Sequence, residues 1–221
     1  RTREPLQIMQ QARLPNSSSG PSKTDRKFHP VTISASMPFK VMSGETLLGD
    51  EGKVRGAAGF QNARLAKAFG IHALRTWGMG QTRASIHQVA AEGLKVSVGL
   101  PMTHDKEKYL GEYCRFDSRW WLARRLEIER DVRSLMRNPA VLWWTVGNEM
   151  EEEVSWSAGS DCLWSRVEWM AKAVKDIDAN HPVGTVLAGF HSLKVGKIVT
   201  MCPSLDFLGI NIYGADAYNL G

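Results

Sequence analysis

The chain alternates short apolar runs with longer amphipathic segments over most of its length. Each apolar run is rich in Val, Ile, Leu and aromatic residues, which is typical of a strand buried on both faces. The expected strands are residues 39–43, 73–77, 94–100, 141–147, 183–188 and 207–213. Apolar residues recur at helical spacing between them, and the expected helices are residues 56–69, 83–92, 120–138, 163–177 and 193–200. This order predicts a parallel sheet with crossover helices.

One apolar run leads directly into an amide and a carboxylic acid. Residues 139–150 read Pro-Ala-Val-Leu-Trp-Trp-Thr-Val-Gly-Asn-Glu-Met, so a buried strand is followed by Gly147, Asn148 and Glu149. A carboxyl where a buried strand reaches the surface is partly desolvated, which raises its pKa toward values useful for proton transfer near neutral pH. Taken alone, the pair is better explained as a strand that ends in polar residues. Residues at the ends of other expected strands, described below, favour a functional site instead.

Several classes of site lack their sequence signals. No Gly-x-Gly-x-x-Gly follows the first expected strand and no Gly-x-x-x-x-Gly-Lys-Ser/Thr occurs, which makes a phosphate-binding doubly wound fold the weaker option. The six His residues are scattered, without His-Glu-x-x-His or a close pair, so we expect no metal site. None of the three Cys residues forms a Cys-x-x-Cys pair. Cys114 and Cys162 both lie in connections that enter helices, which leaves a disulfide between them open.

Composition and charge exclude some classes of function. The 221 residues are 43% hydrophobic, enough for one sizeable domain, and they include no apolar stretch of membrane-spanning length. Much of the net charge of +5 lies in residues 1–27, which we expect to form a flexible basic leader or linker before a folded domain at 28–221. No aromatic-interleaved basic patch or zinc-finger spacing occurs, so we expect no nucleic-acid partner. No targeting segment is present, which leaves the localisation undetermined.

Three segments at expected strand ends resemble the retaining β-glycosidases built on the (β/α)8 barrel. This clan includes the barrel domains of the β-galactosidase and β-glucuronidase type and related mannanases and glucanases. Residues 126–149 are similar to its fourth strand and the lead-in to that strand, residues 71–78 to its second strand, and residues 205–214 to its sixth. The resemblance implies an α/β fold of the TIM (β/α)8 type, incomplete, with about six β/α units present. It implies no cofactor.

The resemblance also implies roles for matching residues. Glu149 would be the general acid/base, and Asn148 would bind the sugar hydroxyl next to the anomeric carbon. Arg75 would hold a carboxylate or contact substrate through its planar fork. Tyr213 would orient the nucleophile. The structural alternatives are an ion pair inside the barrel for Arg75 and an aromatic cap at a strand end for Tyr213.

Two further residues lie at the same expected end of the barrel. Trp77 follows Arg75, where its ring could stack on the apolar side of a pyranose, although Trp is equally common in cores. His104 follows the third expected strand and is a candidate substrate contact; the alternative is an ordinary exposed loop residue.

The chain departs from this clan in one respect. A retaining mechanism needs two carboxyls roughly 5–5.5 Å apart, and in this clan the nucleophile is a Glu at the end of the seventh strand. We find no seventh strand after residues 207–213, so we expect a barrel truncated after the sixth strand, a nucleophile outside this chain, and no activity from residues 1–221 alone. Open sheet edges at residues 39–43 and 207–213 would favour self-association.

The leading hypothesis is therefore a retaining glycoside hydrolase, or the N-terminal part of one, acting on β-linked oligo- or polysaccharides. A glycan transglycosylase uses the same groups and stays open. A non-catalytic carbohydrate-binding or scaffold relative is the main alternative from another class. A different barrel enzyme that uses Glu149 as a simple base has less support.

Overall fold

The computed structural model of the chain describes residues 7–12, 31–32, 53–54, 56–58, 62–102, 119–150, 160–189 and 192–212. Seven strands form one parallel sheet in the order β1-β9-β8-β7-β6-β5-β4. Their bounds are Gln7–Ala12 (β1), Gly56–Ala58 (β4), Ala73–Arg75 (β5), Lys95–Leu100 (β6), Val141–Val146 (β7), Val183–Ala188 (β8) and Phe207–Ile212 (β9). A short antiparallel pair, β2 (Val31–Thr32) and β3 (Lys53–Val54), is separate from this sheet.

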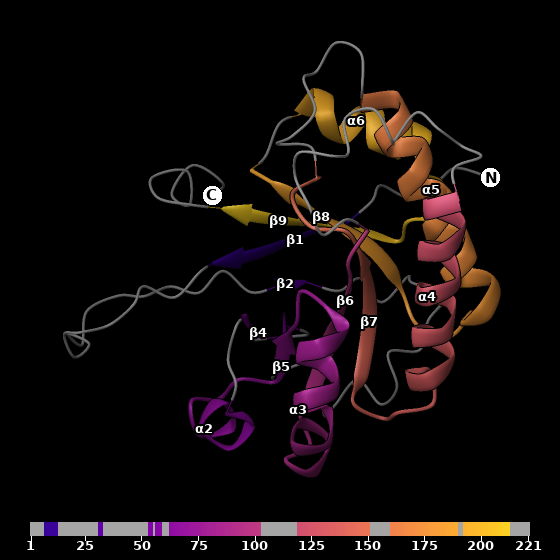
Figure 1. The fold of residues 1–221 in the computed structure, drawn as a ribbon. Coiled ribbons are helices and arrows are strands. Elements are labelled where there is room, and N and C mark those ends of the chain that lie inside the picture. Colours follow the sequence, from indigo (N-terminus) through magenta and orange to yellow (C-terminus); the bar gives the residue numbers. More distant parts are fainter. Residues whose placement is uncertain are drawn as a thin grey trace.

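Helices alternate with the strands from β4 onward. They are α2 (Ala63–Ala68), α3 (Met79–Ala91), α4 (Arg119–Leu135), α5 (Ser160–Ile177) and α6 (Ser192–Met201). Helices α3 to α6 lie on the outer side of the curled sheet (Figure 1). The five strands β5 to β9 with these helices form part of a (β/α)8-type barrel, so the predicted fold class is confirmed. None of the described helices is long and apolar enough to cross a membrane.

Five expected strands overlap β5 to β9, and four expected helices overlap α3 to α6, with α3 beginning at Met79, four residues before its expected start. The prediction of one helix over residues 56–69 is wrong in its first part, because Gly56–Ala58 form β4 and pair with β5. Helix α2 begins only after Asn62, whose side-chain Oδ1 accepts a hydrogen bond from the Leu65 amide at 2.9 Å. An Asn in this position satisfies a free helix-start donor, which fixes where the helix begins. The strand expected at residues 39–43 lies outside the described residues.

The outer face of the sheet holds the hydrophobic core. Leu74, Val98, Trp144, Leu187 and Leu208 belong to one cluster with the buried faces of the helices. All five side chains are at most 3% exposed. Burying a side chain of this size contributes about 1.5–3 kcal/mol, so packing of the helices on this face accounts for much of the stability. The strands therefore hold their carboxyl ends in fixed positions.

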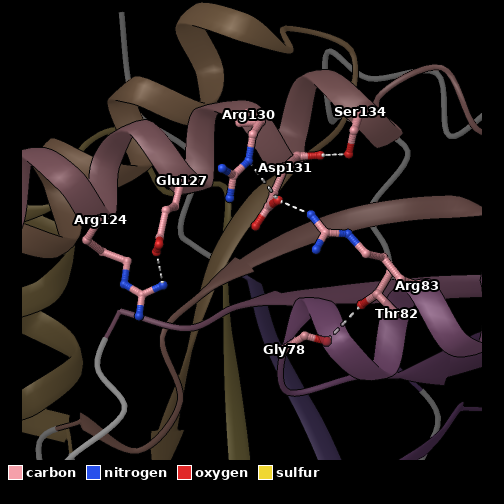
Figure 2. A network of polar contacts seen from close by, with 8 residues as sticks. All are labelled: Gly78, Thr82, Arg83, Arg124, Glu127, Arg130, Asp131 and Ser134. Atoms are coloured by element: carbon pink, nitrogen blue, oxygen red, sulfur yellow. Dashed lines mark hydrogen bonds and ion pairs between the residues drawn. The ribbon is translucent and has the colours of Figure 1, made fainter.

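Helices α3 and α4 are joined by a network of charged groups, shown in Figure 2. Arg83 of α3 donates to the Asp131 carboxylate of α4 at 2.5 Å, and Arg130 lies 3.9 Å from the same carboxylate. Arg124 and Glu127 form a neighbouring pair at 2.6 Å. Burial raises the pKa of Asp131 above its usual value, and the charges of Arg83 and Arg130 offset only part of that effect. The network links two outer helices and lies away from the sheet interior.

Cysteine chemistry differs between two sites. Cys162, at the start of α5, is disulfide-bonded. Cys202, just after α6, is a free and buried thiol whose Sγ lies 3.2 Å from the Trp164 carbonyl oxygen. Burial raises the pKa of Cys202 to about 12, so this thiol is un-ionised at neutral pH and unreactive.

A strand that the sequence did not predict lies in the leader. Residues Gln7–Ala12 form β1 and pair in parallel with β9, in register from Gln7 beside Phe207 to Ala12 beside Ile212. The expectation of an open sheet edge at residues 207–213 is therefore wrong for β9, because β1 occupies that edge. Strand β1 also contacts β4 at the opposite edge, which shows how strongly the sheet curls.

Candidate active site

Side chains from three strands meet at the carboxyl end of the sheet. Arg75 is the last residue of β5, Asn148 and Glu149 follow the end of β7, and Asn211 is the second-last residue of β9. In barrels of parallel strands, residues at this end are the ones that form active sites. Arg75 and Asn211 are buried, whereas Asn148 and Glu149 are half-buried.

Four hydrogen bonds connect these residues. Arg75 donates from Nη1 to Asn211 Oδ1 at 2.9 Å and from Nη2 to Asn148 Oδ1 at 2.5 Å. Asn211 donates from Nδ2 to Asn148 Oδ1 at 3.1 Å and to Glu149 Oε1 at 2.6 Å. Bonds that involve a charged group are the stronger kind, roughly 1.5–3 kcal/mol each. We call Arg75, Asn148, Glu149 and Asn211 the amide cluster.

Asn211 is the central residue of the amide cluster, and the sequence analysis did not select it. It accepts from Arg75 and donates to both Asn148 and Glu149. A signal was available, since Asn211 interrupts the apolar strand Phe-Leu-Gly-Ile-Asn-Ile one residue before its end. A buried amide in such a strand needs hydrogen-bond partners, and partners at a strand end point to a site.

The backbone after β7 is bent to present Glu149. Gly147 has φ 74°, in the left-handed region that glycine adopts without strain. Glu149 has φ 52° and is the non-glycine residue with positive φ in the described part of the chain. Its amide donates to the Val186 carbonyl of β8 at 2.8 Å, which holds the turn. Such a conformation costs on the order of 1–3 kcal/mol and is concentrated at functional sites.

Aromatic residues fill the inner face of the sheet below the amide cluster. The rings of Trp143 and Phe207 lie 5.3 Å apart at 59°. Trp143 Nε1 donates to Ser97 Oγ at 2.6 Å. Gly184 makes room for Phe207, because a Cβ there would meet the Phe207 ring at 2.3 Å. This packing gives the amide cluster a rigid apolar base.

The other expected site residues have different outcomes. Trp77 is half-buried, and its ring centroid lies 5.9 Å from the Arg75 guanidinium carbon, within the range of a cation–π contact. Its backbone amide donates to Gln81 Oε1 at 2.8 Å, which anchors the turn into α3. Tyr213 and His104 lie outside the described residues. Within the described ranges, no group of three or more His, Cys, Asp or Glu side chains is placed to hold a metal ion.

The arrangement supports proton transfer beside a hydrogen-bonding surface. Asn148 Oδ1 accepts from both Arg75 and Asn211, which assigns its amide orientation and makes Nδ2 the donor toward a ligand. Asn211 holds the Glu149 carboxyl in one orientation. A positioned carboxyl beside an oriented amide donor can protonate a leaving oxygen while a neighbouring hydroxyl is bound.

Comparison with known proteins supports the fold. No protein-family model matches the chain, and no curated protein matches it. Among solved structures it is similar to the endo-1,4-β-mannanase of Rhizomucor miehei, with a TM-score of 0.56 and 14% identity over 76% of this chain and 69% of that one. It is also similar to the β-galactosidase of Marinomonas ef1, with a TM-score of 0.54 and 13% identity over 72% and 40% of the two chains.

The β-D-glucuronidase of Dictyoglomus thermophilum gives a TM-score of 0.52 and 18% identity over 76% and 30%. The chain thus spans less than half the length of the β-galactosidase and the β-glucuronidase. Identities this low show the fold alone. The chain therefore has the fold of the TIM-barrel glycoside hydrolases, in an incomplete form.

Proposed function

We propose that the chain carries the acid/base half of a retaining β-glycosidase, with Glu149 as the general acid/base. The observation that supports this proposal is the amide cluster, which places a half-buried carboxyl beside an oriented amide at the carboxyl end of a parallel barrel sheet. The substrate class is β-linked oligo- or polysaccharide, as the names of the similar structures suggest. The reaction needs no cofactor.

Each residue of the cluster has a part in the proposed chemistry. Glu149 gives its proton to the glycosidic oxygen as the bond breaks and later activates the incoming water. Asn148 donates from Nδ2 to the hydroxyl next to the anomeric carbon, a bond that strengthens in the transition state. Arg75 fixes Asn148 and Asn211 through its fork. Trp77, Tyr213 and His104 are proposed sugar contacts around this centre.

The two described strands beside β9 do not supply the second carboxyl of the mechanism. A retaining reaction requires a nucleophile roughly 5–5.5 Å from the acid/base. The strands that pair with β9 are β1 and β8, and neither contains Asp or Glu. We propose that the nucleophile belongs to a segment outside residues 1–221, with water or a second sugar as the final acceptor.

One observation favours a second candidate function. The absence of Asp and Glu from β1 and β8, the described strands beside β9, also fits a carbohydrate-binding relative that binds sugars without turnover. Turnover separates the two. We expect no hydrolysis of aryl β-glycosides by residues 1–221, and hydrolysis by a chain extended through a seventh strand that ends in Glu.

The test of Glu149 uses that extended chain. Glu149→Gln should lower turnover of glycosides with poor leaving groups by about 10²–10⁴-fold, and that of activated aryl glycosides much less, because only the former need a proton from the acid. Glu127→Gln on the outer face of α4 is the matched control and should change neither. Equal losses on both substrate types would mean that Glu149 has only a structural role.

A further inference from the structure

Helix α4 carries a row of arginine and leucine side chains along its solvent-facing side. Arg119, Leu122, Leu126, Arg130 and Arg133 follow one another at intervals of three or four residues, which places them on one face of the helix. All five are exposed, and the exposed fractions of Leu122 and Leu126 are 50% and 66%. We call these five residues the Arg-Leu strip. It contains no acidic residue.

The acidic residues of α4 do not neutralise the Arg-Leu strip. Each of the three carboxylates of this helix is bound by an arginine outside the strip, in the pairs Glu127–Arg124, Glu129–Arg125 and Asp131–Arg83. Figure 2 shows the first and the third of these pairs. Arg130 lies 3.9 Å from the Asp131 carboxylate, which Arg83 already binds. Arg119 and Arg133 form no ion pair with any residue in the described part of the chain. The strip therefore presents positive charge to solvent.

The neighbouring helices do not cover the strip. Helix α4 joins α3 through Arg83 and Asp131, and it joins α5 through Trp121, whose ring centroid lies 5.1 Å from the Arg166 guanidinium carbon. The sheet lies behind α4, so the strip is on its remaining, outer side (Figure 1). Single exposed leucines are common, but two of them one turn apart among arginines form a patch of the kind that marks an interaction surface.

The mixture of leucine and arginine selects among anionic partners. Nucleic acid or an acidic polysaccharide would match the arginines and leave both leucines in water. A protein partner needs roughly 800 Å² on each side with an apolar centre, and two leucines on one convex helix supply little of that. The boundary between anionic headgroups and acyl chains accepts both kinds of side chain, because lipid phosphates attract arginine there and leucine inserts beside them.

We propose that the Arg-Leu strip binds the surface of an anionic lipid bilayer, with α4 lying in the plane of the headgroups. The inference does not depend on the proposed glycosidase function. Helix α4 lies on the outer side of the sheet, whereas the amide cluster lies at the carboxyl ends of the strands. Attachment through α4 would hold the chain at a membrane surface whichever sugar the candidate site takes.

The first arm of the test measures co-sedimentation of residues 1–221 with vesicles that contain about 40% phosphatidylserine in phosphatidylcholine. We expect binding at about 0.05 M NaCl that weakens as salt is added, and none to pure phosphatidylcholine. Arg119→Gln with Arg133→Gln should weaken binding by about 25-fold, or fivefold for each arginine. The matched control, Arg64→Gln with Lys172→Gln, removes two exposed positive charges from α2 and α5 and should change binding by less than about threefold.

The second arm tests the leucines against the same vesicles. Leu122→Gln with Leu126→Gln should weaken binding by at least about fivefold, because the inserted apolar surface is lost. Leu65→Gln with Phe69→Gln is the matched control, since these two side chains are similarly exposed on α2, and binding should stay within about twofold of the wild type. Urea unfolding of each variant checks that the fold is retained, which is expected because every substituted side chain is exposed.

The outcomes decide between lipid and other partners. Absence of binding by the unsubstituted chain would overturn the proposal, and so would equal losses in the arginine variant and its control, which would reflect net charge alone. A loss in the arginine variant without a loss in the leucine variant would overturn insertion into lipid and indicate a polyanion such as nucleic acid or an acidic polysaccharide. None of these results bears on the role of Glu149.

Discussion

Arg75 and Arg83 lie close together in the sequence, yet their guanidinium groups have different surroundings. Arg75 ends β5, is 5% exposed, and donates to the amide oxygens of Asn148 and Asn211. The Arg83 side chain is 56% exposed and donates to the Asp131 carboxylate in the network of Figure 2. The first set of bonds joins a guanidinium to amide oxygens, whereas the second pairs it with a carboxylate.

This difference shows how to tell a site from a structural clamp. In the network between α3 and α4, each arginine faces a carboxylate, and the result is a link between two helices. In the amide cluster, the Arg75 guanidinium donates to amide oxygens, and the amide of Asn211 donates to the one carboxyl, Glu149, whose backbone has positive φ. Buried amides held in one orientation beside a strained acid are expected where a ligand binds. Ion pairs on outer helices are expected for packing.

The largest expected contrast comes from the same substitution at both arginines. Arg75→Lys removes the planar fork and leaves a buried amide acceptor unsatisfied, which should lower the free energy of unfolding by about 2–4 kcal/mol. Arg83→Lys keeps the charge at an exposed site and should cost less than about 1 kcal/mol. Urea unfolding of both variants measures the difference. Equal losses would mean that the hydrogen bonds of Arg75 contribute no more to the free energy of unfolding than the ion pair of Arg83.

A second contrast removes one hydrogen-bonding side chain from each region. Asn211→Ala deletes one acceptor and two donor contacts in the amide cluster and should cost about 2–3 kcal/mol. Ser134→Ala deletes one bond, from Ser134 Oγ to the Asp131 carbonyl at 2.7 Å, and should cost under about 0.5 kcal/mol. Thermal unfolding of the two variants is the measurement. A cost for Asn211→Ala as small as that for Ser134→Ala would contradict the central position assigned to Asn211.

The sequence predicts β5 to β9 well because each coincides with an apolar run that has a clear stop. The end of β7 shows this, since six buried residues are followed by Gly147 and then by the polar pair Asn148 and Glu149. Parallel strand ends meet at one edge, so the proximity of Arg75 to Asn148 could be predicted from order alone.

Other features depend on contacts that no local pattern encodes. Strand β1 has the sequence Gln-Ile-Met-Gln-Gln-Ala, which lacks the apolar content of a buried strand, and its position follows from pairing with β9 far along the chain. The role of Asn211 needs the curl of the sheet, which brings β9 within hydrogen-bond reach of Asn148. The sequence predicts helix at β4 because its three residues are Gly and Ala, which show no hydrophobic periodicity of either strand or helix.

A smaller effect should separate the two regions by their response to salt. Arg83 is largely exposed, so its attraction to Asp131 is screened, and the cost of Arg83→Ala should fall toward zero between 0.05 and about 1 M NaCl. The bonds of Arg75 to Asn148 and Asn211 are buried, and the cost of Arg75→Lys should stay nearly constant. Urea unfolding at both salt concentrations gives the comparison. A salt-dependent cost for Arg75→Lys would place that side chain in contact with solvent.

The smallest expected effect concerns pH and Asp131. Burial raises the pKa of Asp131 in the folded chain, so the native state holds this proton more tightly than the unfolded state, where the pKa is about 4. Between the two pKa values the folded state therefore binds more protons, and the contribution of Asp131 to stability falls as the pH rises through this window.

Asp131→Asn removes the titration and still offers an oxygen to Arg83. The difference in free energy of unfolding between Asp131→Asn and the wild type should move in favour of the variant as the pH rises from 3.5 to 7. Urea unfolding at intervals across that range measures it, and a trend in the opposite direction would mean that the Arg83 and Arg130 charges outweigh the burial of this carboxylate.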